Sequence, residues 1–197
     1  MNVSATRVSL IEKLCDHQDN VAWTEFANLY GPVIYAYGLK RGLQSADATD
    51  LTQDVLQIVM DSVTKFQYRQ PGSFRGWLFT ITLNRIRRRH VLAQRQIAGS
   101  GRTTVAQALG NHAKEEQDWD QQLQMHLFHW AAEQIRSEFQ ENSWQAFWQT
   151  SVEQQPAAKV AEQLKMSVGS VYVAKSRIIK RIREKVAYAQ DGGGTDQ

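Results

Sequence analysis

Apolar residues recur at steps of three and four along most of this 197-residue chain, and this spacing constrains its fold more than any other feature. The clearest stripe runs through Leu51, Val55, Ile58, Val59, Ser62, Val63 and Phe66. Only three prolines and twelve glycines interrupt the chain, and helix-forming residues dominate its long segments. The sequence therefore predicts an all-α protein.

The first half of the chain contains two closely spaced helical segments. Residues 21–37 carry one apolar face, and Pro32 is expected to kink this helix or to divide it in two. A second helix is expected to begin near Ser45 or Asp47, either of which can cap it, and to end near Phe66.

A turn-rich loop then separates these helices from a third. Pro71-Gly72 forms the corner of the loop, and Ser73 is expected to cap a helix that ends near Arg95. Residues 96–117 lose the helical periodicity and contain several glycines, which predicts a flexible linker.

We expect two small helical domains, which cover residues 1–95 and 118–190 and are joined by the linker 96–117. In the second domain, helices are predicted at about 118–139 and 143–152, before a helix-turn-helix. Residues 191–197 are expected to form a disordered tail.

The net charge of +3 conceals an uneven distribution along the chain. Basic residues concentrate in 85–95 and 175–185, whereas acidic residues dominate 114–141. Two separate cationic surfaces are typical of a protein that contacts a polyanion at two places.

Residues 156–186 have the size and order of a helix-turn-helix. Pro156 suits the first turn of a helix, residues 165–167 form a break, and Ser167 can cap the second helix. That second helix would enter the major groove and bury Val168, Val171, Ala174 or the stem of Lys175, Ile178, Ile179 and Ile182. The alternative is a basic helix end that is merely solvated and complements the helix dipole.

The third helix ends in a cluster of arginines, which includes Arg85 and residues 87–89. Such a cluster suits contacts to a nucleic-acid backbone, and the preceding loop offers Tyr68, Arg69 and Gln70 for stacking and hydrogen bonds to bases. For the aromatic residues at 74 and 77, at helical spacing, packing in the core is the better interpretation. For Tyr68 the core and the stacking interpretations stand equally.

Three segments together resemble RNA polymerase sigma factors of the extracytoplasmic-function (ECF) type. Residues 46–59 resemble the polymerase-binding helix, residues 74–89 resemble the helix that follows it, and residues 160–184 resemble the C-terminal helix-turn-helix. The resemblance implies a cytoplasmic initiation factor that binds core RNA polymerase and promoter DNA. Many factors of this type are also held by an anti-sigma protein.

The resemblance also implies roles for individual residues. The clamp helices of the largest polymerase subunit would bind Asp50, Gln53 and Asp54. The minus-ten element would be recognised and melted by Tyr68, Arg69, Gln70, Asn84, Arg85, Arg87, Arg88 and Arg89. The minus-thirty-five element would be read as a duplex by Ser167, Ser170, Tyr172, Lys175, Ser176, Arg177 and Arg181.

Two segments depart from the family pattern. Tyr172-Val173-Ala174 stands where the family often has Arg-Ser-Arg, and residues 143–156 replace a leucine-rich stretch that ends in glycine. These departures indicate a divergent branch, whose promoter sequence cannot be inferred from the family.

Two other functions compete with this interpretation. A stand-alone helix-turn-helix regulator would explain the C-terminal half but leaves Asp50, Asp54 and the arginine helix without a role. An enzyme is disfavoured, because His126 and His129 lack a third metal ligand and the sequence has no phosphate-binding glycine loop or nucleophile elbow. We expect no cofactor, no metal, no membrane span and, since Cys15 is the only cysteine, no internal disulfide.

Overall fold

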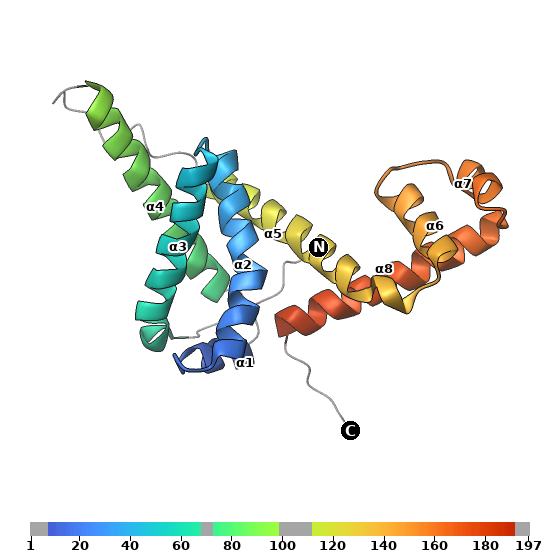
Figure 1. Ribbon diagram of the computed structural model, residues 1–197, viewed down its shortest axis with the longest axis horizontal. Helices are drawn as coiled ribbons and strands as arrows, with labels where there is room; N and C mark the ends of the chain where they lie inside the picture. Colours follow the sequence, from blue (N-terminus) through green and yellow to red (C-terminus); the bar gives the residue numbers. More distant parts are fainter. Residues whose placement is uncertain (1–7, 68–72, 99–111, 192–197) are drawn as a thin grey trace. The chain divides into compact units, whose positions relative to one another are not determined.

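The computed structural model describes residues 8–67, 73–98 and 112–191, and in these ranges every regular element is helical (Figure 1). The prediction of an all-α fold is confirmed. In chain order the elements are α1 (Val8–Leu14), α2 (Asn20–Lys40), α3 (Ser45–Ser62), the 3-10 helix η1 (Val63–Lys65), α4 (Ser73–Ala98), α5 (His112–Ile135), the 3-10 helix η3 (Arg136–Glu138), α6 (Glu141–Ser151), α7 (Ala157–Gln163) and α8 (Val168–Asp191).

The chain divides into two compact units, and the division falls inside α5, after His126. The second unit comprises Leu127–Ala189. The first half of α5 therefore belongs to the first unit, although we expected the second domain to begin at residue 118. The segment 99–111 of the expected linker lies outside the described residues, whereas residues 112–117 are helical. Ion pairs from its acidic residues to α2 and α4 hold the start of α5 on the first unit.

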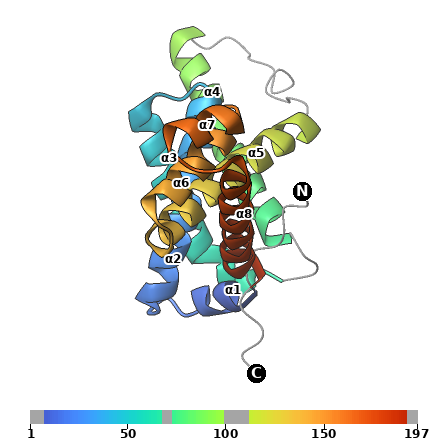
Figure 2. The same ribbon diagram turned by 90° about the vertical axis from the view of Figure 1, so that its right-hand side faces the viewer.

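The core of the first unit forms between α2, α3 and α4, and α2 and α3 lie side by side in both views (Figures 1 and 2). The predicted stripe of α3 is buried there at Leu51, Val55 and Val59. Opposite it, α2 and α4 bury Phe26, Ile34, Tyr37, Phe74, Leu78 and Phe79. The backbone of α2 approaches α3 closely at Gly38, where an added Cβ would lie 3.0 Å from Leu51 Cδ2 and 3.4 Å from Ala48 Cβ.

Replacing Gly38 by Ala is expected to lower the free energy of unfolding by about 1–3 kcal/mol, because the new methyl group overpacks the contact between α2 and α3. Gly76→Ala is the matched control, since an added Cβ at Gly76 meets no atom within 4 Å. That change should stabilise α4 by up to about 1 kcal/mol through helix propensity. Urea titration of both variants measures the difference, and equal shifts of the same sign would contradict the close packing.

The helix α2 continues through Pro32, so the prediction that this proline could divide it is wrong. Proline has no N–H and cannot donate to the carbonyl of Asn28, four residues earlier. In this structure His126 Nε2 lies 3.3 Å from that carbonyl oxygen. The imidazole N–H therefore donates the hydrogen bond that Pro32 cannot make, which lowers the cost of a proline inside the helix.

Two of the expected N-caps are also wrong. The N-cap of α3 is Gln44, which makes no side-chain capping bond, and Ser45 is already the first helical residue. Asp47 lies in the first turn, where its carboxylate favours the helix dipole without capping it. Similarly, α4 begins at Ser73 itself.

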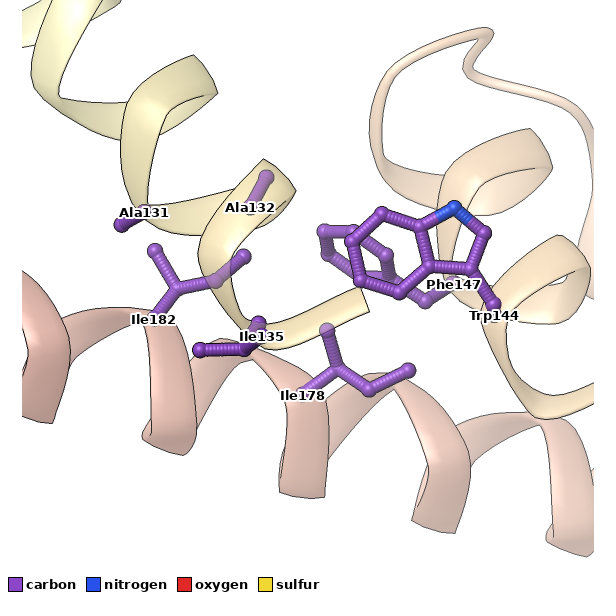
Figure 3. Close-up of a cluster of buried hydrophobic side chains, with 7 residues drawn as sticks. All are labelled: Ala131, Ala132, Ile135, Trp144, Phe147, Ile178 and Ile182. Atoms are coloured by element: carbon purple, nitrogen blue, oxygen red, sulfur yellow. The ribbon is translucent and has the colours of Figure 1, made fainter. Parts of the chain in front are cut away.

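The second unit holds a core made by α5, α6 and α8. Ile178 and Ile182 of α8 point toward Ile135 and two alanines of α5, with Trp144 and Phe147 of α6 beside them (Figure 3). A smaller cluster joins α6, α7 and α8 through Ala146, Val160, Ala161, Val171 and Ala174. The helix-turn-helix, α7 and α8, is thus held on α6.

The turn before α8 matches the sequence prediction closely. Lys165 adopts a positive φ of 53°, and Ser167 caps α8 by accepting from the N–H of Ser170 at 3.0 Å. One expected core residue is misplaced, because Val168 is 43% exposed. None of the described helices is long and apolar enough to cross a membrane.

Candidate polymerase and nucleic-acid interfaces

The predicted polymerase-binding residues share one face of α3. Asp50, Gln53 and Asp54 are spaced at i, i+3 and i+4, so their side chains are neighbours. Asp50 and Gln53 are exposed. Asp54 accepts a hydrogen bond from Arg89 Nη2 at 2.8 Å, and Arg89 Nη1 lies 3.9 Å from Asp47 Oδ1. Asp50 is therefore the carboxylate on this face that has no ion pair with any described residue.

The arginines of α4 point in different directions. Arg88 and Asn84 are exposed and lie one turn apart, and Arg85 is half-buried on the same side. Arg87 instead forms an ion pair with Glu115 at 2.7 Å, and Arg89 is held by Asp54. The predicted loop residues Tyr68, Arg69 and Gln70 lie outside the described residues. Asn84, Arg85 and Arg88 are therefore the predicted residues of α4, among those described, that no ion pair engages.

Glu115 is a buried carboxylate that sequence reasoning placed in a linker. It is 2% exposed and forms ion pairs with Arg41 at the end of α2 and with Arg87 of α4. The phenol of Tyr37 donates to its carbonyl oxygen at 3.2 Å. Burial raises the pKa of Tyr37 to about 12, so this phenol keeps its proton at neutral pH and remains a donor.

Two more ion pairs attach the start of α5 to the first unit. Lys40 Nζ lies 2.8 Å from Asp118, and Arg75 Nη1 lies 2.9 Å from Asp120. The hydrogen bond from Lys40 holds the pKa of Asp118 below its usual value. Between the two carboxylates, Trp119 is fully buried. The acidic segment therefore neutralises cations of the first unit. Glu115 and Trp119 are four residues apart and in register with the apolar residues further along α5, and this spacing in the sequence could have revealed the packing.

Arg88→Ala is expected to reduce the salt dependence of DNA binding, because the removal of one phosphate contact lowers the slope of log K against log salt by about 0.7–0.9. Arg87→Ala should leave this slope unchanged, since Glu115 already neutralises that guanidinium. Fluorescence anisotropy with single-stranded DNA, over a range of KCl concentrations, measures both slopes. Equal reductions in the two variants would contradict the different orientations of Arg87 and Arg88.

The predicted duplex-reading residues lie on α8 with unequal accessibility. Tyr172 is 59% exposed, and Ser176 and Arg177 are also exposed. The hydroxyls of Ser167 and Ser170 lie 2.8 Å apart and take part in the helix cap. Lys175 is half-buried. Arg181 donates to Glu138 from Nε at 2.6 Å and from Nη2 at 3.0 Å, so it serves first to attach α8 to η3.

The histidines that sequence reasoning considered as metal ligands are placed differently. His126 contacts the Asn28 carbonyl, and the ring of His129 lies 6.3 Å from that of Trp148. Within the described ranges, no three His, Cys, Asp or Glu side chains come together in a way that could hold a metal ion.

Comparison with known proteins identifies the first unit. Residues 26–96 match the family model for sigma-70 region 2. Over 78 residues the chain is 30% identical to the ECF RNA polymerase sigma factor RpoE of Cereibacter sphaeroides, a match that covers 40% of this chain and 42% of that protein. The match thus spans less than half of the relative's length. The chain is also similar to CnrH, solved in complex with the cytosolic domain of CnrY, with a TM-score of 0.37 and 16% identity over 89% of this chain and 94% of that one.

The helices α2, α3 and α4 therefore constitute a sigma-70 region 2. In this region the chain is similar to a sigma factor of the ECF type. The resemblance predicted from residues 46–59 and 74–89 is confirmed, since both segments lie inside the matched region.

Proposed function

We propose that this chain is a transcription initiation factor that binds core RNA polymerase and directs it to specific promoters. In this proposal the exposed side of α3, with Asp50 and Gln53, binds the polymerase. The exposed side of α4, with Asn84, Arg85 and Arg88, captures the melted minus-ten strand together with the loop 67–73. The helix α8 reads the minus-thirty-five element in the major groove.

The observation that carries this proposal is the match of residues 26–96 to sigma-70 region 2. Two features of the structure support it independently. An acidic face on α3 and a basic face on α4 lie on neighbouring helices of one compact unit. A capped helix-turn-helix, whose second helix carries the cations Arg177, Lys180 and Arg183, occupies the other unit.

Retention of purified core RNA polymerase on the immobilised full chain tests the proposal. We expect a stable complex that survives washing at moderate salt, because the interface includes apolar contacts as well as charges. Binding of duplex DNA without retention of polymerase would instead favour a stand-alone helix-turn-helix regulator. That alternative explains α7 and α8 but not the exposed acidic face of α3. An anti-sigma partner stays a prediction of the resemblance.

A further inference from the structure

The first two turns of α8 expose an unusual group of apolar side chains. Val168, Tyr172 and Val173 are 43%, 59% and 52% exposed, respectively. Val168 and Tyr172 are one helical turn apart and share one side of α8, whereas Val173 follows Tyr172 and lines the cleft beside η3. We call these three residues the apolar patch. Tyr172 and Val173 stand where the family often has polar and basic residues.

The charges around the apolar patch favour nucleic acid as its partner. Arg177, Lys180 and Arg183 are carried further along the same helix. Glu138 of η3, a carboxylate that lines the same cleft as Val173, is ion-paired with Arg181. Val173 and Arg177 line the same cleft between α8 and η3. Exposed apolar side chains at the start of α8, followed by cations along the same helix, suit a polyanion that also presents apolar groups.

The major groove of DNA meets this description. Phosphates line its edges, and the apolar group on its floor is the C5-methyl of thymine. Polar readout from the helix start is limited here, because the hydroxyls of Ser167 and Ser170 are bonded to each other and Gly169 has no side chain. The apolar patch is left as the group that can distinguish one base from another in the first two turns.

We propose that Tyr172 and Val173 are specificity-determining residues that contact thymine methyl groups in the minus-thirty-five duplex. This inference rests on the proposed function, because it requires α8 to lie in the major groove. The inference adds a preference for thymine, which cannot be read from the residues that the family often has at these positions. It also assigns the phosphate contacts to Arg177, Lys180 and Arg183.

Replacing thymine by deoxyuridine tests the inference, since it removes the methyl group and leaves the base pairing intact. The full chain, in complex with core polymerase, first selects duplexes from a pool with a random stretch of about one helical turn. Each thymine of the selected site is then replaced in turn. At the contacted position the wild-type complex should bind the deoxyuridine duplex about fourfold more weakly, as expected for one buried methyl group.

The variant Val173→Ala or Tyr172→Ala should lose this discrimination at one position and bind both duplexes equally. Lys180→Ala is the control, because removing a phosphate-binding cation weakens both duplexes alike. Unchanged discrimination in both patch variants, or no discrimination in the wild type, would overturn the inference. Weaker polymerase binding by the patch variants, with discrimination intact, would also overturn it and indicate a protein partner. In each of these cases the wild-type chain still retains core polymerase. If the proposed function is wrong, the wild-type chain does not retain core polymerase at all, so the two failures can be distinguished.

Discussion

Trp119→Ala is expected to lower the free energy of unfolding of the first unit by about 3–5 kcal/mol, the usual cost of truncating a fully buried tryptophan. The indole lies edge-on to Tyr37 with 5.4 Å between ring centroids, and 5.9 Å from Phe79. Removing it leaves a cavity between α2, α4 and α5. The substitution also loosens two neighbouring carboxylates that attach α5 to three cations. Glu115 lies one helical turn before Trp119, and Asp118 lies one residue before it.

Met125→Ala is the matched control, because Met125 lies on the same helix and is 52% exposed. That change should alter stability by no more than about 0.5 kcal/mol. Urea unfolding, followed by far-ultraviolet circular dichroism, compares the two variants. A decrease below about 1 kcal/mol in Trp119→Ala would mean that the start of α5 does not belong to the core of the first unit.

Charge reversal at Asp50 should have the largest effect on function. Asp50→Lys is expected to weaken core polymerase binding about 30-fold or more, because like charges at an interface cost several kcal/mol. The fold should be preserved, since Asp50 is exposed and has no ion pair with any described residue. Asp54 is a poorer choice for this test, because its reversal would also release Arg89.

Glu12→Lys supplies the control for Asp50→Lys. It makes the same change in net charge at an exposed position of α1, which packs on α2 and η1. Fluorescence anisotropy of labelled chain titrated with core polymerase gives both affinities. If the two reversals weaken binding equally, the effect is one of overall charge, and the acidic face of α3 is not the polymerase interface.

Features set by short stretches of sequence could be predicted here. The apolar stripe of α3 and the cap at Ser167 depend on residues within one or two turns, so their spacing alone was sufficient. The family resemblance was detectable for the same reason, because the motif around Asp50 and the arginine run each lie on one helix.

Features that depend on distant residues could not be predicted. The hydrogen bond from His126 to the carbonyl that Pro32 leaves unpaired joins residues 98 positions apart, which only the folded chain brings near. Which arginines are ion-paired within the fold depends in part on Glu115, because its carboxylate pairs with Arg87 and Arg41 from two other helices. A run of acidic residues in the sequence does not reveal which one is buried.

Run-off transcription is the most direct test of the central claim, that this chain gives RNA polymerase its promoter specificity. Purified core enzyme is mixed with fragments of the source genome, with and without the full chain. We predict discrete transcripts that appear only when the chain is present and that Asp50→Lys abolishes. Absence of any chain-dependent transcript, from a folded chain that binds duplex DNA, would contradict the account.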